Sequence, residues 1–174
     1  MIRCLITDGR LDNVARWIAQ GVELVQIRER DLNARQLAEF TRAVLATPNP
    51  AGTKILVNDR ADVAIACGAH GVHLRDRSVL PERFARPGFL VTVSCHSLED
   101  AAWATGADYV LLAPIFQPLS KTDSRPALGT GAISEFARKS RVPVLALGGI
   151  TAENAHLCME AGAAGVAGIT YFAR

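Results

Sequence analysis

The chain has 174 residues, 49% of them hydrophobic, and a formal net charge of +2 at pH 7. This length predicts one domain over residues 1–174 with a sizeable core. The near-neutral charge gives no indication of a nucleic-acid partner, and no apolar run approaches the roughly 18 residues of a membrane span. The first residues carry no signal-peptide pattern, so we expect a cytoplasmic protein without a membrane partner.

In chain order, short apolar runs alternate with helix-like segments. Strands are expected near residues 2–7, 22–27, 54–58, 71–74, 90–94, 109–112, 142–147 and 165–169. Every second strand follows a glycine, namely Gly21, Gly68, Gly106 and Gly162, and glycine suits the position just past a helix, where φ is positive. This weak repetition predicts an α/β fold, a compact (β/α)8 TIM barrel, rather than an open doubly wound sheet.

The helices and the end of the chain follow from the same pattern. Helices are expected at about residues 13–20, 34–46 and 61–67, with Asp12 and Asn33 as N-caps of the first two. The sequence stops at Arg174, shortly after the eighth strand, so the final outer helix is expected to be missing or very short. A partner subunit or a local rearrangement should cover the apolar face left there. We therefore expect a homo-oligomer, and a dimer in the first instance.

Polar residues gather where the predicted strands end. They are Gln26, Arg28, Asn58, Asp59, His73, Asp76, Ser94, His96 and Lys121. The opposite ends carry mostly Gly, Ala and Pro. Because the active sites of such barrels lie at the C-terminal ends of the strands, this asymmetry predicts an enzyme with its site at that mouth.

Two glycine-containing strand ends are candidates for phosphate binding. Gly148 and Gly149 follow the seventh strand, and Gly168, Ile169 and Thr170 follow the eighth. Backbone N–H groups exposed at these turns would bind a phosphate, which barrels of this kind often place after strands 7 and 8. The alternative is that the glycines only permit tight turns.

Gln26 and Arg28 lie two residues apart, on the same side of the second strand. An amide and a guanidinium directed into the barrel mouth suit an anionic or heteroaromatic ligand. The alternative is that Arg28 forms a salt bridge with Asp8 or Glu29.

Asn58 and Asp59 end the third strand, and Asp76 follows the fourth. Mg²⁺ typically takes one or two carboxylates together with substrate phosphates, so Asp59 and Asp76 are candidate metal ligands. The alternative is that Asp59 simply pairs with Arg28 or Arg60.

His96 ends the fifth strand, with Ser94 on the same face. A histidine at a barrel mouth suits acid–base catalysis near neutral pH, whereas His73 has a more structural setting. In the long loop after the sixth strand, Ser120 and Lys121 are candidates to close over a phosphate; the alternative is an ordinary solvated lysine.

Six segments together resemble the family of thiamine-phosphate synthase and its sister, the thiazole tautomerase. They are residues 26–30, 58–60, 71–74, 106–110, 120–122 and 148–150, in the family's order. The resemblance implies a (β/α)8 barrel of the thiamine pathway whose partner is a small phosphorylated thiazole. The synthase joins this thiazole to hydroxymethylpyrimidine diphosphate with Mg²⁺, whereas the tautomerase needs no cofactor and moves a proton by means of a histidine.

The match to the synthase pattern is incomplete after the fourth strand. There the synthase reads Gly-Gln-x-Asp, with the Asp on the metal, and this chain reads Arg75-Asp76-Arg77-Ser78. Arg75 therefore adds bulk and charge where the family has glycine, and Ser78 replaces a carboxylate. Gln26 and Arg28 still fit the pyrimidine and diphosphate contacts of the family, and Asn58 and Asp59 also match its pattern, with Asp59 as a metal ligand.

Segment 94–99 resembles the His-bearing strand end of the tautomerase, so the pattern favours a thiazole tautomerase with His96 as acid/base. The first alternative is a thiamine-phosphate synthase in which Asp59 and Asp76 hold Mg²⁺ while Arg28 and Lys121 stabilise the departing pyrophosphate. Further alternatives are a non-catalytic regulator that binds a phosphorylated ligand, and an epimerase or aldolase acting on another phosphorylated substrate.

Overall fold

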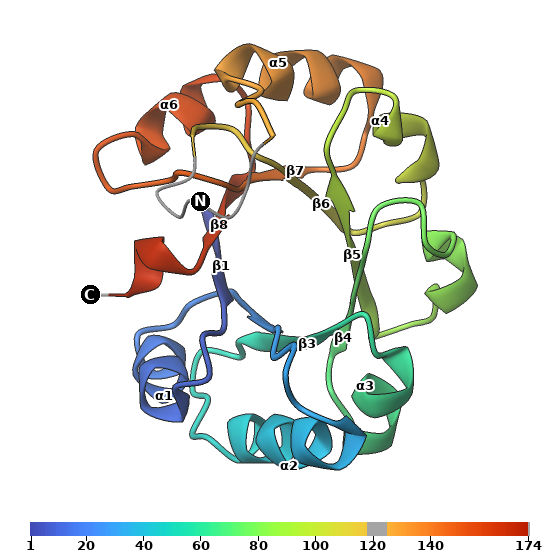
Figure 1. The fold of residues 1–174 in the computed structure, drawn as a ribbon, viewed down its shortest axis with the longest axis vertical. Coiled ribbons are helices and arrows are strands. Elements are labelled where there is room, and N and C mark those ends of the chain that lie inside the picture. Colours follow the sequence, from blue (N-terminus) through green and yellow to red (C-terminus); the bar gives the residue numbers. More distant parts are fainter. Residues whose placement is uncertain (118–124, 174) are drawn as a thin grey trace.

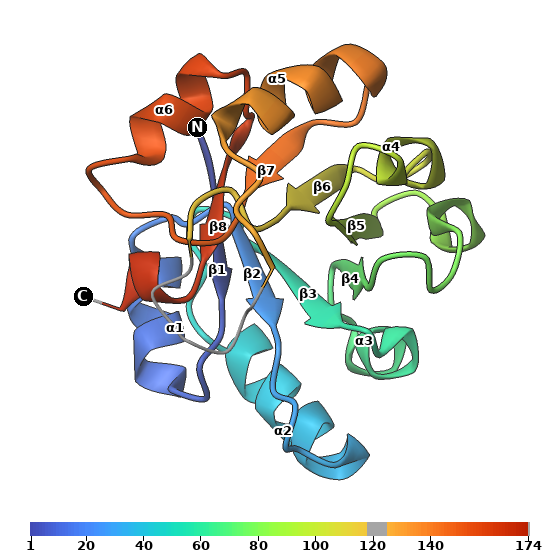
Figure 2. The ribbon, with the colours of Figure 1, turned by 45° about the horizontal axis from the view of Figure 1, so that its top comes forward.

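The computed structural model describes residues 1–117 and 125–173, in which eight parallel strands close into one barrel in chain order. The strands are β1 (Ile2–Ile6), β2 (Leu24–Ile27), β3 (Lys54–Asn58), β4 (Gly71–Leu74), β5 (Leu90–Cys95), β6 (Tyr109–Leu112), β7 (Val144–Ala146) and β8 (Gly165–Gly168). Figure 1 shows the helices as a ring outside the strands, and Figure 2 shows the same barrel tilted. Each strand coincides with a predicted one, which confirms the TIM barrel and excludes the open sheet.

The outer elements are short. They are α1 (Leu11–Ala19), α2 (Ala34–Leu45), α3 (Ala61–Cys67), the 3-10 turn η1 (Pro81–Phe84), α4 (Asp100–Trp103), α5 (Thr130–Lys139), α6 (Ala155–Glu160) and the 3-10 turn η2 (Thr170–Phe172). No helix within the described residues is long and apolar enough to cross a membrane. As predicted, Asn33 caps α2, in a capping box with Gln36. Asp12 is not a cap, because α1 already begins at Leu11.

The core has two layers because successive strand residues point to opposite faces. In β2, Val25 and Ile27 face outward and pack under the helices, whereas Leu24 and Gln26 face into the barrel. The apolar filling of the barrel interior consists of Cys4, Ile6, Leu24, Leu56, Leu111, Leu145 and Ala167. The interior is therefore a packed core below its mouth, and the polar site lies on top of it.

The four repeated glycines have the backbone conformation that their position predicts. Their φ angles are 71° at Gly21, 73° at Gly68, 88° at Gly106 and 98° at Gly162. A residue with a Cβ atom is strained in this region, so glycine allows each helix to end and the chain to turn directly into the next strand.

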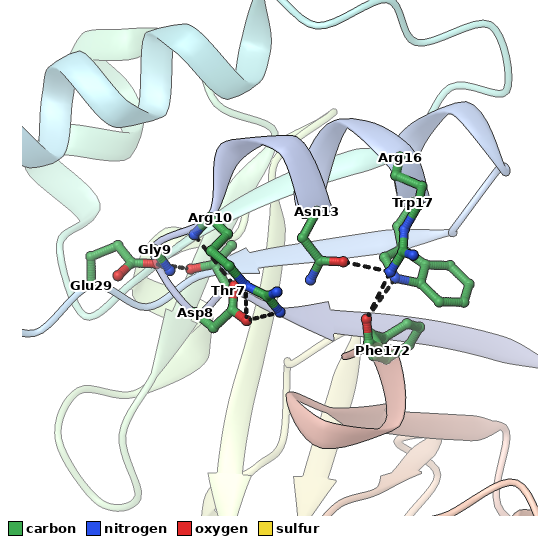
Figure 3. Close-up of polar contacts among 9 residues, drawn as sticks. All are labelled: Thr7, Asp8, Gly9, Arg10, Asn13, Arg16, Trp17, Glu29 and Phe172. Carbon is green, nitrogen blue, oxygen red and sulfur yellow. Dashed lines mark hydrogen bonds and ion pairs between the residues drawn. The ribbon is translucent and has the colours of Figure 1, made fainter. Parts of the chain in front are cut away.

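A local rearrangement covers the side of the barrel that follows β8. The ring of Phe172 in η2 is fully buried and meets the Trp17 ring edge-to-face, with 4.9 Å between ring centroids. Nε1 of Trp17 donates a hydrogen bond of 2.8 Å to the carbonyl oxygen of Phe172 (Figure 3). Of the two coverings predicted for this face, the local rearrangement is therefore present, while the partner subunit stays a prediction.

Replacement of this anchor should destabilise the barrel. Phe172→Ala should lower the free energy of unfolding by about 3 kcal/mol, because it leaves a cavity between η2 and α1. Urea unfolding followed by tryptophan fluorescence measures the loss. Leu157→Ala is the control, since that side chain is 40% exposed and its loss should cost about 0.5 kcal/mol or less. Equal effects of the two substitutions would contradict the anchoring role.

Candidate active site

A cavity of about 900 Å³ opens at the C-terminal ends of the strands. Its lining includes every predicted site residue that the structure describes, namely Gln26, Arg28, Asn58, Asp59, Asp76, Ser94, His96, Gly148, Gly149, Gly168, Ile169 and Thr170. Ser120 and Lys121 lie outside the described residues, so their roles stay predictions. Their positions at strand ends were therefore enough to predict that these residues share one site. The volume of this site suits a small molecule.

The floor of the cavity holds a buried acceptor without a partner. Gln26 is only 3% exposed, and its Nε2 atom donates a hydrogen bond of 3.0 Å to Oδ1 of Asn58. Its Oε1 atom is buried and has no hydrogen-bond partner among the described residues. Because an unpaired buried acceptor is costly, this oxygen suits a ligand that brings an N–H or O–H donor.

The guanidinium of Arg28 is available to a ligand. It forms no hydrogen bond or ion pair with residues 1–117 or 125–173; only the backbone N–H of Arg28 is bound, to Oγ1 of Thr7 at 3.0 Å. Both alternative partners are engaged elsewhere: Glu29 accepts from Thr7, and Asp8 pairs with Arg10 at 2.6 Å (Figure 3). An unpaired guanidinium at the cavity wall suits an anion.

His73 is a buried fixture, as predicted, and it also orients a site residue. Its Nδ1 atom is 2.8 Å from Oγ1 of Thr92, and its Nε2 atom is 2.9 Å from Oγ of Ser94. Burial, together with the nearby His96, lowers the pKa of His73 to about 3. The ring is therefore neutral at pH 7, and it fixes the Ser94 hydroxyl at the cavity wall.

His96 has one bound and one open ring nitrogen. Its Nδ1 atom is 2.8 Å from the carbonyl oxygen of Ala113, which can only accept, so Nδ1 carries the proton in the neutral ring. Nε2 has no partner among the described residues, so its lone pair is available in a residue that lines the cavity, as a general base requires.

Two residues that position His96 were missed by the sequence reasoning. Asp100, at 3% exposure, accepts from the backbone N–H groups of His96 at 2.8 Å and Ser97 at 3.0 Å, and from Nε of Arg77 at 2.9 Å. Burial raises the pKa of Asp100, but the hydrogen bonds from His96 and Arg77 outweigh it and leave that pKa lowered. The Ser97 hydroxyl does not cap α4, whose N-cap residue is Glu99. The sequence signal that could have indicated this role is an acidic residue four positions after a histidine at a strand end.

The turn after β7 fits an anion. Gly148 and Gly149 have φ angles of 93° and 63°, and a Cβ atom on Gly149 would lie 2.6 Å from the carbonyl oxygen of Gln117. Their N–H groups have no acceptor within the described part of the chain. The glycines thus permit a tight turn, which was the alternative expectation. The same turn also leaves N–H donors at the cavity that suit a phosphate.

The carboxylate pair expected to hold Mg²⁺, Asp59 and Asp76, is not free, because Asp59 already has a cationic partner. Oδ2 of Asp59 is 2.8 Å from Nε of Arg75, so this carboxylate is already paired, with neither of the partners expected for it. Arg60 instead pairs with Asp62 at 2.6 Å. No group of three or more His, Cys, Asp or Glu that could hold a metal occurs among the described residues. A cation on Asp59 would have to displace the Arg75 guanidinium.

Comparisons with known proteins agree on one family. The sequence model of the family described as "Thiamine monophosphate synthase" matches residues 3–172. The chain is 39% identical over 178 aligned residues to the thiamine-phosphate synthase of Chlorobium luteolum, covering 97% of this chain and 84% of that protein. It is 42% identical over 158 residues to the thiamine-phosphate synthase of Methanoculleus marisnigri, covering 87% and 74%.

A solved structure gives the same result. The thiamine phosphate pyrophosphorylase from Pyrococcus furiosus superimposes with a TM-score of 0.85 at 28% identity, covering 97% of this chain and 85% of that one. The two curated relatives carry the name synthase. The comparisons therefore support the synthase alternative rather than the tautomerase that segment 94–99 favoured.

The neutral His73 should make stability depend on pH. In the unfolded chain this histidine takes up a proton below its ordinary pKa of 6.5, whereas in the folded chain it does so only near 3. Between these values the unfolded state binds one more proton, so stability falls on acidification, by about 1.4 kcal/mol per pH unit. Urea unfolding between pH 6.5 and 4.5 measures this slope.

Two variants assign the slope to His73. His73→Gln should make it shallower, and His156→Gln, at an exposed position, should leave it unchanged. An unaltered slope in the His73 variant would contradict the buried neutral ring.

Proposed function

The chain belongs to the thiamine monophosphate synthase family, and from this we propose that it is a thiamine-phosphate synthase. It joins hydroxymethylpyrimidine diphosphate to a thiazole phosphate and releases pyrophosphate. One observation carries the proposal: a single cavity presents the Arg28 guanidinium, just after β2, and the backbone N–H groups of Gly148 and Gly149, after β7, all without partners among residues 1–117 and 125–173. Two separate anion-binding groups in one cavity suit an enzyme that binds two phosphorylated substrates next to each other.

The reaction makes specific demands on these residues. The bond between the methylene carbon of the pyrimidine and the diphosphate oxygen breaks, and its electron pair leaves with pyrophosphate. The thiazole nitrogen supplies the pair for the new C–N bond. Negative charge therefore grows on the leaving group, where the Arg28 guanidinium stabilises it without taking or giving a proton.

The remaining residues bind and orient the two rings. Oε1 of Gln26, which lacks a partner in the described part of the chain, accepts from an amino group of the pyrimidine, and Asn58 holds that glutamine in place. Ser94, fixed by His73, contacts the same substrate. Ser120 and Lys121 close over the phosphates in this proposal, as the resemblance implies. Such positioning raises the rate by holding the reacting atoms near each other.

The thiazole tautomerase is a second candidate because of His96. This residue lines the cavity, its Nε2 atom has no partner among the described residues, and its Nδ1 atom is held by the carbonyl of Ala113. A base with a free lone pair beside a phosphorylated thiazole carboxylate removes a proton from the ring and returns it elsewhere, an effect worth about 10²–10⁴-fold in rate.

Two further features belong to the proposal. A cytoplasmic location suits an enzyme that acts on small phosphorylated intermediates. A homo-oligomer, in the first instance a dimer, would add cover to the side of the barrel next to η2. Light scattering on the purified protein measures its oligomeric state.

Loss of Arg28 should weaken synthesis strongly. Arg28→Ala should lower kcat/KM for thiamine phosphate formation by about 10²-fold, the usual effect of removing one preorganised charge-stabilising donor. Steady-state kinetics with both substrates measure this. Arg42→Ala is the matched control, because Arg42 is exposed on α2, away from the cavity, and should keep full activity. Comparable rates in both variants would remove Arg28 from the mechanism.

His96 separates the two candidate reactions. In a synthase, His96→Asn should reduce thiamine phosphate formation by no more than about tenfold, because the substitution step needs no base. In a tautomerase the same variant should lose isomerisation of the thiazole carboxylate phosphate almost completely. Both reactions would be measured for the wild-type chain and the His96→Asn variant. Abolished thiamine phosphate synthesis in the variant would contradict the proposed role of His96.

A further inference from the structure

Arg75 lies directly after β4, at the mouth of the cavity. Its Nε atom is 2.8 Å from Oδ2 of Asp59, and its side chain is 70% exposed. A guanidinium carries five N–H donors in a rigid fork. Asp59 engages the Nε side, and the other donors form no hydrogen bond with residues 1–117 or 125–173, so they remain for a ligand at the mouth of the cavity.

Asp59 is held in a fixed position beside this cation. Its φ angle is 59°, in the left-handed region that is strained for a residue with a side chain. Its backbone N–H donates a hydrogen bond of 2.7 Å to the carbonyl oxygen of His73. A divalent cation on the Asp59 carboxylate would sit beside a guanidinium, and like charges at contact distance repel.

The loop after β4 is built to hold Arg75. Oγ of Ser78 donates a hydrogen bond of 2.9 Å to the carbonyl oxygen of Arg75, which closes a turn. Arg77, two residues on, is tied by its Nε atom to Oδ1 of Asp100 at 2.9 Å. Both ends of the segment are therefore fixed, and position 78 forms a turn instead of offering a carboxylate to a metal.

The charge at this side of the mouth suits a polyanion. Arg75 directly follows β4, and Arg28, whose guanidinium has no partner among the described residues, directly follows β2, so they lie on either side of the end of β3. The acidic residue next to Arg28, Glu29, is engaged with Thr7 and with the backbone of Gly9. Two guanidinium groups thus border the cavity where the strands β2–β4 end.

We propose that Arg75 takes the role that a divalent cation would have: its guanidinium binds the diphosphate without metal, and Asp59 orients it. The identity of that diphosphate as the pyrimidine substrate rests on the proposed function. When the C–O bond breaks, the electron pair leaves with pyrophosphate, and Arg75 matches the growing charge by charge-assisted hydrogen bonds. No proton moves, and Asp59 acts as a positioning residue.

Inorganic pyrophosphate is the direct probe. Calorimetric titration of the purified chain in EDTA should show pyrophosphate binding, and saturating Mg²⁺ should change the affinity by less than about threefold. Binding only in the presence of Mg²⁺ would overturn the inference.

Variants test the assignment to Arg75. Arg75→Ala should weaken pyrophosphate binding in EDTA by about tenfold or more, the loss expected for one charge-assisted contact. Arg83→Ala is the matched control, because Arg83 is exposed in η1 and does not line the cavity. Arg75→Lys should recover part of the affinity by restoring the charge. Wild-type affinity in the Arg75→Ala variant would also overturn the inference.

The test is independent of turnover. A chain that binds pyrophosphate through Arg75 yet makes no thiamine phosphate would refute the proposed function and leave this inference intact. The opposite result is also possible: the wild-type chain makes thiamine phosphate only when Mg²⁺ is present, and the Arg75→Ala variant makes it at the same rate. That result would leave the proposed function intact and refute this inference.

Discussion

Closure of eight short strands into a barrel is the constraint on which the rest of the structure depends. Because side chains alternate along a strand, half of each strand must fill the interior, which Leu24, Leu56, Leu111 and Leu145 do with apolar groups. Only the last inward-facing position of each strand reaches the mouth, where a polar group can bind solvent or a ligand. Leu24 and Gln26 are successive inward-facing residues of β2; the first belongs to the apolar core and the second to the candidate active site.

The mouth has a neutral floor and a cationic rim. His73, buried and neutral, fixes the Ser94 hydroxyl, and Gln26 binds Asn58, so the floor offers hydrogen-bonding groups without charge. The rim carries Arg28, and the turn after β7 adds backbone donors. This division suits substrates with flat heterocycles and charged phosphates, which the barrel would hold in one orientation.

Much of this arrangement follows from local sequence pattern. Strand positions, the positive-φ glycines after helices and the strand-end site residues depend on spacing along the chain, which a sequence displays. The Asp59–Arg75 pair and the contact of Asp100 with the His96 loop depend on side chains of neighbouring loops meeting in space. The sequence placed Arg75 as an obstacle to substrate, and only the geometry revealed its partner.

Product analysis of the wild-type chain tests the central claim most directly. The purified protein would be incubated with hydroxymethylpyrimidine diphosphate and thiazole phosphate, and thiamine phosphate and pyrophosphate would be quantified together. A synthase should give both products in equal amounts. Absence of both, with isomerisation of the thiazole carboxylate phosphate in a parallel sample, would contradict it and assign the cavity to the tautomerase reaction.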